Sequence, residues 1–288
     1  MDTELARTFL TVIDAGNFIG ASDRLHVTQS TVSARIHALE DQLGCRLFVR
    51  NKAGTTLTPA GHQFQKHASV LVRTVEHARQ DVGIARGFRA SLTVGGRFGL
   101  WERLLLQWLP IMRRSAPDIS VRAEIGFEAD LMQGLIEGRL DIGVMYTPQS
   151  RPGLTVEPFL EETLIMVTTT PRDSAEPDDN YIYIDWGPEF FAQHNARFPE
   201  FVGAGLSANI GWLGMQHILE NGGTGYFPAR LVAPHLADGR LIKVGDAPPF
   251  SLPAHLVYAN DADQDLLAPA LASIRALADT KKAQPDLS

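Results

Sequence analysis

The chain contains only one cysteine, Cys45, in 288 residues. A lone cysteine excludes an intramolecular disulfide and a zinc site built from several cysteines, and we expect it to be a buried structural thiol. The histidines show no HExxH pattern, so we expect no metal and no other cofactor. No stretch approaches 18 uninterrupted apolar residues and no secretory signal is visible, which favours a cytoplasmic protein without a membrane partner.

Positive charge is also scarce, because 26 Lys and Arg stand against 33 Asp and Glu, a net charge of −7. Residues 1–90 nevertheless hold 11 of the basic residues and 8 of the acidic ones, so this part alone is positively charged. The rest of the chain is acidic, but this does not exclude a nucleic-acid partner, because only the basic N-terminal module needs to contact the phosphates of a nucleic acid. The length, with 44% apolar residues, is sufficient for two domains with buried cores.

The first 45 residues predict three short helices. A helix with apolar spacing covers residues 3–15, a short helix begins after the capping type Asn17, and a third begins after Thr28 and ends at Gly44. Two short helices joined by a few residues, after a supporting helix, form a helix-turn-helix.

The side of the third helix away from its apolar stripe is polar. Its members are the hydrogen-bonding residues Gln29, Ser30, Thr31, Ser33 and Arg35. Such side chains read base edges in a major groove or contact phosphate. The alternative is an ordinary solvated helix surface.

A two-stranded hairpin is predicted next. Residues 46–49 and 55–58 alternate like strands, and the turn between them contains Arg50 and Lys52. A basic hairpin after a helix-turn-helix is a wing, which we expect to contact the phosphate backbone or the minor groove. Residues 1–58 therefore read as a winged helix-turn-helix domain that binds double-stranded DNA.

Residues 59–88 predict a long linker helix that begins with Pro59 in its first turn. Its apolar residues recur at alternating spacings of three and four: Ala60, Phe64, Ala68, Leu71, Val75, Ala78, Val82 and Ala85. This narrow seam favours a partner helix and hence a homodimer. Packing onto its own globular domain is the alternative.

Strands alternate with helices over residues 91–288, which indicates an α/β domain with a largely parallel sheet. Strands are expected at 92–94, 119–125, 142–146, 164–168, 181–184, 241–244 and 255–258, and helices at 104–112, 130–137, 190–197, 215–220 and 266–278. Two subdomains are expected, one of about 91–162 with 266–288 and one of about 163–265. A small ligand would bind in the crevice between them.

We find no catalytic pattern and expect that the protein is not an enzyme. The turn at residues 95–99 lacks the spacing of a dinucleotide site, and the run 261–265 lacks the glycine of a calcium loop. The turn beside Arg97 could instead hold a carboxylate, although a tight turn with no ligand explains it equally well. The candidate effector-binding residues are Gly96, Arg97, Phe98, Trp101, Glu128, Trp186 and Thr224.

The sequence resembles the LysR-type transcriptional regulators. The residues that support this are Phe9-Leu10-Thr11-Val12, Gly16-Asn17-Phe18, Leu25-His26-Val27-Thr28-Gln29-Ser30, Leu39-Glu40, Leu43-Gly44, Leu47-Phe48-Val49-Arg50, Gly138-Arg139-Leu140-Asp141 and Gly225-Tyr226-Phe227-Pro228. Residues 100–102, 107–109 and 185–190 are most similar to the HdfR-like branch, whose proteins regulate genes that include flagellar ones. The resemblance implies a linker-helix dimer, usually doubled to a tetramer, and a periplasmic-binding-protein-like effector domain. The implied partners are DNA, a second copy, an unknown small-molecule effector and RNA polymerase.

The motif implies DNA contacts at Gln29, Ser30 and Ser33, places Arg35 and His37 near the DNA, and puts Arg50 and Lys52 on the wing. Ser22, Thr28 and Thr31 complete the DNA-binding candidates. Two positions depart from the family, since Ala34 and His37 stand where many members have basic residues. In the effector domain, Arg97 and Phe98 stand where many members have small hydroxyl residues for a carboxylate. We therefore expect the crevice between the two subdomains to take an unusual ligand or to be blocked. A small-molecule-binding protein with a vestigial DNA-binding module is the alternative to a regulator.

Overall fold

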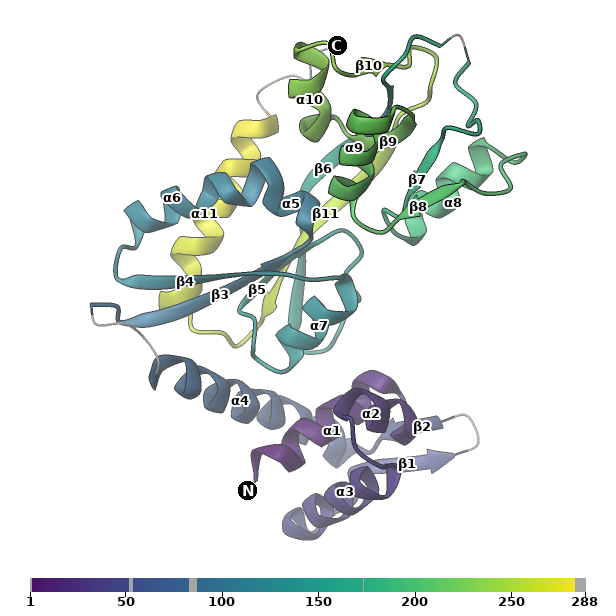
Figure 1. The fold of residues 1–288 in the computed structure, drawn as a ribbon. Helices are drawn as coiled ribbons and strands as arrows, with labels where there is room; N and C mark the ends of the chain where they lie inside the picture. Colours follow the sequence, from purple (N-terminus) through teal and green to yellow (C-terminus); the bar gives the residue numbers. More distant parts are fainter. Residues whose placement is uncertain (1, 52–53, 83–86, 173, 283–288) are drawn as a thin grey trace.

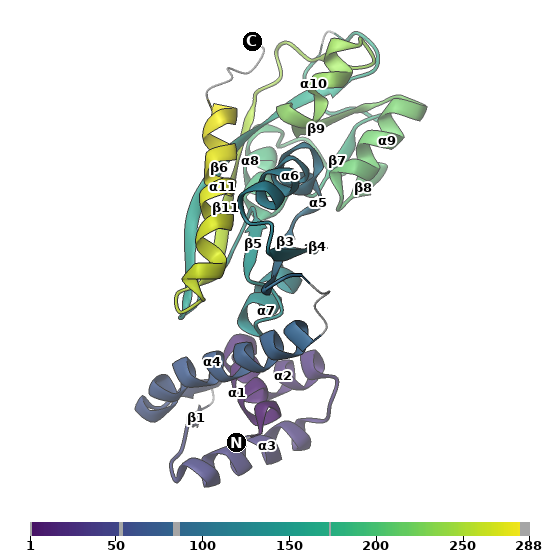
Figure 2. The ribbon, with the colours of Figure 1, turned by 90° about the vertical axis from the view of Figure 1, so that its left-hand side faces the viewer.

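The computed structural model describes residues 2–51, 54–82, 87–172 and 174–282. A helical N-terminal module is joined through the long helix α4 (Pro59–Val82) to a larger domain of helices and strands (Figure 1). Helix α4 and the helix α7 (Glu128–Ile136) of the larger domain lie side by side in both views (Figure 2). Lys52 and Ala85, expected in the wing and the linker helix, lie outside the described residues.

The N-terminal module has the three predicted helices and the predicted hairpin. These are α1 (Thr3–Ala15), α2 (Phe18–Leu25), α3 (Gln29–Leu43), β1 (Phe48–Asn51) and β2 (Gly54–Leu57). The side chains of Asn17 and Thr28 accept backbone N–H bonds at the starts of α2 and α3, and Gly44 ends α3 in the left-handed conformation. Phe9 packs against the rings of Phe48 and Phe64, so the helices, the wing and α4 share one core.

Helix α4 differs from the prediction in how it uses its apolar residues. Phe64 and Ala68, in the first half of the expected seam, are buried in the core of their own module. The alternative of packing on the chain's own domain is therefore correct for this half. Of the seam residues on the C-terminal half, Val75 is half-buried, Ala78 is exposed and Val82 is 90% exposed. Val70, which was not part of the expected seam, is 45% exposed.

The C-terminal domain is built on a seven-stranded sheet of order β10-β6-β11-β5-β3-β4, with β9 paired to β6. The strands are β3 (Ala90–Gly96), β4 (Ile119–Ile125), β5 (Ile142–Met145), β6 (Leu154–Thr168), β9 (Thr224–Pro228), β10 (Ile242–Lys243) and β11 (Phe250–Ala259). Within the described sheet, only the pairs that β3 makes with β4 and β5 are parallel. The expectation of a largely parallel sheet was therefore wrong.

The reason is that β6 and β11 are much longer than predicted and pair with each other in antiparallel fashion. The first part of β6 was not predicted as a strand, because the stretch Glu157–Glu162 is polar and contains a proline at position 158. Residues 154–164 of β6 face β11, whereas residues 164–168 face β9. The boundary between the two proposed subdomains falls inside this one strand.

Helices cover both faces of the sheet. On one side lie α5 (Phe98–Leu100), a distorted turn η1 (Trp101–Leu105), α6 (Leu106–Ser115) and α11 (Gln264–Lys282); α7 lies on the other (Figure 1). The Nε1 atom of Trp108 donates to Oγ of Ser273, which joins α6 to α11. The remaining elements are α8 (Pro188–Arg197), α9 (Gly211–Asn221), α10 (Ala229–Ala237) and the small parallel sheet of β7 (Ile182–Ile184) with β8 (Leu206–Ala208).

Cys45 is exposed, so the expectation of a buried thiol was wrong. It follows Gly44 directly after α3, where its backbone N–H is bonded to the carbonyl oxygen of Glu40. The core of the hairpin begins only at Leu47, which is fully buried.

Candidate nucleic-acid interface and ligand cleft

The outer face of α3 is exposed and mostly uncharged. Gln29 and Ser30 at its first turn, and Ala34 and His37 further along, are all exposed, whereas Ser33 is half-buried. Val32 and Leu39 are fully buried on the opposite side. The helix therefore offers its N-terminal amide and hydroxyl groups to solvent, as a recognition helix must.

Hydroxyl groups at the start of α3 hold one another in place. The Oγ1 atom of Thr28 accepts the backbone N–H of Thr31 and lies 2.8 Å from the hydroxyl oxygens of both Ser30 and Thr31. The N-cap thus orders two of the predicted DNA-binding side chains as well as the backbone.

Arg35 and Ser22 are engaged inside the module instead of being presented outward. Nη1 of Arg35 donates to Oγ1 of Thr8 at 3.3 Å and lies 3.4 Å from the Glu4 carboxylate, both on α1. Arg35 adjoins the buried stripe of α3, so its long side chain reaches α1. Ser22 is buried and donates to the carbonyl oxygen of Ile19.

Arg46 is a functional candidate that the sequence did not single out. Its Nη1 atom lies 3.1 Å from Nδ1 of His37 and 2.7 Å from the carboxylate of Glu40. Because Arg46 was assigned to a strand, its place beside the outer face of α3 could not be seen. The structure brings together an exposed arginine and an exposed histidine next to the wing.

Glu40 is the buried centre of this group. Its Oε1 atom accepts the backbone N–H groups of Leu47 and Phe48, at 2.8 and 3.3 Å. Burial alone would raise the pKa of Glu40, but these bonds and the contact with Arg46 outweigh it and lower the pKa. The ionised carboxylate fixes the wing against the end of α3.

The wing is anchored to α4 by a close approach at Gly61. A Cβ atom there would lie 2.3 Å from the carbonyl oxygen of Leu47, so only glycine fits. Arg50 pairs with Thr55 in the antiparallel ladder of β1 with β2. The described part of the wing therefore places Arg50 near its tip.

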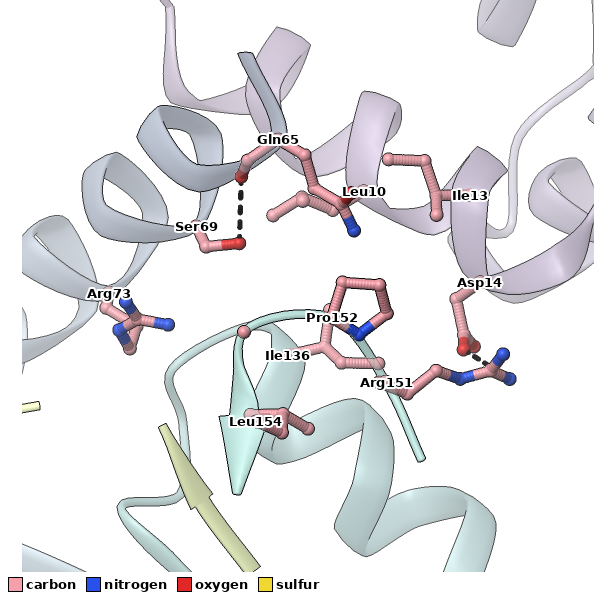
Figure 3. A pocket seen from close by; sticks show the side chains of 11 residues that line it. Leu10, Ile13, Asp14, Gln65, Ser69, Arg73, Ile136, Arg151, Pro152 and Leu154 are labelled. Carbon is pink, nitrogen blue, oxygen red and sulfur yellow. Dashed lines mark hydrogen bonds and ion pairs between the residues drawn. The ribbon is translucent and has the colours of Figure 1, made fainter. Parts of the chain in front are cut away.

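The N-terminal module and the C-terminal domain meet at a polar junction. Asp14 of α1 lies between two arginines, bonded through Oδ2 to Arg24 and through Oδ1 to Arg151, the latter at 2.9 Å. Figure 3 shows Arg151 and Pro152 facing α1 across a small cavity. Its volume, about 70 Å³, is sufficient for a few waters and not for an effector.

Helix α4 forms the rest of the junction. Arg73 is paired with Asp261, and Nε2 of His77 lies 2.9 Å from Oδ1 of Asp141. Gly138, at φ +72°, lies against Arg73 so closely that a Cβ would be 2.6 Å from its Cα. The sequence motif at 138–141 therefore supplies the surface that receives α4.

The larger cavity, about 270 Å³, opens at the carboxyl ends of β3, β4 and β5. Ligands commonly bind at that edge of parallel strands in α/β proteins. The cavity is lined by Arg97, Phe98, Gly99, Ile125, Gly126, Phe127, Asp130, Tyr146, Trp186, Asn209, Ile210 and Gly211. We call it the cleft.

The predicted effector-binding residues are only partly brought together. Arg97, Phe98 and Trp186 line the cleft. Gly96 packs against Trp101, whose Nε1 atom donates to the carbonyl oxygen of Glu124. Thr224 does not line the cleft but is buried at the start of β9, where it contacts Thr168 and Arg172.

The guanidinium of Arg97 is already engaged. Nη1 lies 3.3 Å from the Glu128 carboxylate, Nη2 donates to the carbonyl oxygen of Asn209 at 3.5 Å, and the group lies over the ring of Phe127 at 4.7 Å. Glu128, which does not itself line the cleft, thus neutralises the only basic side chain among the residues that line it.

A buried polar network lies behind the cleft. It could not be predicted from the sequence, because its members are far apart in the chain. The hydroxyl of Tyr146 donates to Glu162 at 2.9 Å, and Nε of Arg230 donates to the same carboxyl group at 2.7 Å. Arg230 also bonds the carbonyl oxygens of Gly99 and Glu102. Burial and the neighbouring Glu162 raise the pKa of Tyr146, so its hydroxyl remains a donor.

Neither a metal centre nor a membrane span is found in the part of the chain that the structure describes. No group of three or more His, Cys, Asp or Glu there could hold a metal ion. Among the described helices, none combines the length and hydropathy needed to cross a bilayer.

Comparisons with known proteins match both halves of the chain. Residues 3–62 match the bacterial regulatory helix-turn-helix protein family of the lysR type, and residues 85–174 match the LysR substrate binding domain. The HTH-type transcriptional regulator HdfR of Yersinia pestis (strain Pestoides F) is 29% identical over 278 residues, which cover 93% of this chain and 94% of that protein.

Solved structures share the whole fold. Full-length LysG from Corynebacterium glutamicum with bound effector Arg has a TM-score of 0.57 at 21% identity, covering 97% of this chain and 99% of LysG. Full-length CbnR in complex with its target DNA has a TM-score of 0.51 at 20% identity, covering 96% of this chain and 100% of CbnR. With its N-terminal helix-turn-helix and C-terminal substrate-binding domain, the chain belongs to the LysR family of DNA-binding transcriptional regulators.

Proposed function

We propose that this protein binds a specific operator as a homodimer in the cytoplasm, and that a small molecule in the cleft modulates this binding. The observation that carries the proposal is the exposed start of α3, where Gln29 and Ser30 face solvent while Val32 and Leu39 fix the helix from behind. The solved complex of CbnR with its target DNA, which has the same fold, supports it.

In this proposal α3 contacts the base edges, and basic residues next to α3 and in the wing contact the phosphates. Gln29, Ser30 and Ser33 are the proposed base readers, with His37 next to them on the outer face. Thr28 and Thr31 order the first turn. Arg46, together with the wing residues Arg50 and Lys52, meets the backbone. We omit Ser22 and Arg35 from the proposed contacts, because both side chains are bonded within the module.

The homodimer forms through the exposed side of α4. The exposed residues of this side recur at every fourth position, and on the C-terminal half they are small or apolar: Val70, Thr74, Ala78 and Val82. At about 1.5 Å per residue the 24-residue helix is about 36 Å long. A second copy would cover this stripe and present two recognition helices to half-sites about one duplex turn apart.

In this proposal the effector shifts the equilibrium between conformations of the C-terminal domain. A ligand that prefers one relative position of the two subdomains stabilises it and thereby changes how the paired modules meet DNA. Pairing of dimers into a tetramer, and contact with RNA polymerase at a promoter, belong to this proposal. Its target genes are neighbouring genes or, from the similarity to HdfR, flagellar genes.

A gel-retardation assay on the DNA upstream of the protein's own gene tests this function. We expect a complex that resists an excess of unrelated duplex and weakens as salt rises from 50 to 200 mM, because phosphate contacts release counterions. Equal affinity for unrelated duplex at both salt concentrations would contradict operator recognition. That result would favour the alternative, a small-molecule-binding protein with a vestigial module.

A further inference from the structure

We infer that the cleft binds an organic cation that carries a flat apolar group, an aromatic amine, in preference to a carboxylate. The inference rests on the proposed role of the cleft as the effector site, and it names the ligand class that the lining residues would recognise. It departs from the expectation that Arg97 traps a carboxylate.

The first argument is that Arg97 has little positive charge left to offer. Its side chain is only 11% exposed and its guanidinium is paired with Glu128 at 3.3 Å. A carboxylate ligand would have to displace Glu128, whose side chain is 25% exposed and would lose its cation. An unpaired charge in a partly buried place is costly, so this pairing selects against anions.

The second argument is the acidic residue that remains. The Asp130 carboxylate lines the cleft, and none of the hydrogen bonds or ion pairs found among the described residues involves it. Since Arg97 is paired with Glu128, the charged residues that line the cleft, taken together with Glu128, carry one net negative charge. An ammonium group would find its partner in Asp130.

The third argument is the aromatic wall. Phe98, Phe127, Tyr146 and Trp186 line the cleft, and Trp212 lies beside Phe98 with ring centroids 6.1 Å apart. Aromatic faces attract cations through their quadrupole and also bury flat apolar groups. Arg97 itself demonstrates the chemistry, because its cation is held here by a ring, a carboxylate and a carbonyl oxygen.

The wall is preformed, which favours binding without reorganisation. Trp186 is fixed by the bond from its Nε1 atom to the carbonyl oxygen of Tyr226 at 2.9 Å. Gly211 lies against the same indole, and a Cβ there would be 2.2 Å from it. The indole therefore has one defined position in the cleft.

Matched probes with the same aromatic group and linker, which differ only in their charged end group, test the inference. Isothermal titration calorimetry on the full chain would compare tryptamine with indole-3-propionate, and phenethylamine with 3-phenylpropionate. We expect each amine to bind about tenfold or more tightly than its acid. Equal or tighter binding of the acids would overturn the inference, as would no binding of either amine at millimolar concentration.

Two variants locate the effect. Asp130→Asn should weaken tryptamine binding about tenfold, and Glu128→Gln should free Arg97 and strengthen binding of indole-3-propionate. Glu200→Gln, an exposed acid outside the cleft, is the matched control and should change neither. A charge preference that stays unaltered in Asp130→Asn would contradict our assignment, provided that circular dichroism shows the variant to be folded.

The gel-retardation assay is run on the same preparations. Specific DNA binding without any preference for the amines overturns this inference and leaves the proposed regulator intact. A preference for the amines without specific DNA binding supports the inference and contradicts operator recognition instead.

Discussion

The Nδ1 atom of His37 lies 3.1 Å from Nη1 of Arg46. A guanidinium only donates hydrogen bonds, so Nδ1 accepts, and the proton of the neutral imidazole is on Nε2. His37 is exposed on the outer face of α3. Arg46 therefore fixes the tautomer that, in the proposed complex, would offer an N–H donor to an acceptor on a base edge, such as N7 or O6 of guanine.

We predict that His37→Ala loses preference at one base position in each half-site. Removing a single hydrogen bond should weaken binding by about 1 kcal/mol, and the other positions should keep their preference. Selection from a randomised duplex pool, followed by sequencing, measures this. Gln42→Ala, exposed near the end of α3, is the control; an unaltered profile in His37→Ala would show that this histidine reads no base.

Glu40→Gln is expected to destabilise the N-terminal module by about 1–3 kcal/mol at pH 7, because the carboxylate holds Arg46 and two backbone N–H groups of the wing. The folded state lowers the pKa of Glu40 below 4.5, so its contribution is present above that pH and is lost as pH falls through the folded pKa. Urea denaturation at pH 7 and in acid should show the difference between variant and parent shrinking. A constant difference would mean that the charge of Glu40 is unimportant.

Gly138→Ala should disturb the junction between the domains. Gly138 and Gly239 have similar positive φ values, +72° and +75°, but only at Gly138 would a Cβ meet another residue, Arg73. The backbone strain of about 1–2 kcal/mol is common to both, so Gly239→Ala is the matched control. We expect Gly138→Ala to lower the melting temperature clearly more than Gly239→Ala; equal losses would contradict the close packing on α4.

His194 should make stability depend on pH. Its ring is fully buried, Nε2 lies 2.9 Å from the hydroxyl of Tyr181, and burial lowers the pKa of His194. The unfolded state therefore binds a proton first, and stability should fall below about pH 6.5, by at most about 1.4 kcal/mol per pH unit. Melting temperatures from pH 7.5 to 5.5 test this. His194→Phe should flatten the profile and His67→Gln, at an exposed position, should not.

Val82→Glu should weaken the proposed homodimer. A charge in the covered stripe of α4 would be desolvated without a partner. Val202, which is fully exposed on a loop of the C-terminal domain, provides the control Val202→Glu. Sedimentation velocity should show a shift toward monomer for Val82→Glu alone, whereas equal behaviour of the two variants would place the dimer contact elsewhere.

The N-terminal module could be predicted from the sequence because its signals are local. Asn17, Thr28 and Gly44 cap their helices as expected, and the apolar spacing of α3 gave its buried side. The position of the Arg35 side chain could not be predicted from such local signals. The exposure of its side chain depends on the contacts with Glu4 and Thr8 of α1, and these contacts are set by tertiary packing, which the local sequence does not reveal.

The C-terminal domain was harder because its strands are long and partly polar. No strand was predicted at β9, and the first ten residues of β6 were missed because that stretch contains several glutamates. In the cleft, Arg97 was found from its turn, but its pairing with Glu128 depends on how β3 and β4 place their ends together. That pairing is the reason why we infer a cationic ligand where the turn at Arg97 suggested a carboxylate.

Asp14 gives the two domains a shared ionic contact. One of its carboxylate oxygens binds Arg151 of the C-terminal domain, and the other binds Arg24 of the first helix of the helix-turn-helix. A displacement of the loop that holds Arg151 would remove one of the two cations around Asp14 and so strengthen its pairing with Arg24. The two domains are thus linked electrostatically at Asp14, separately from their covalent connection through α4.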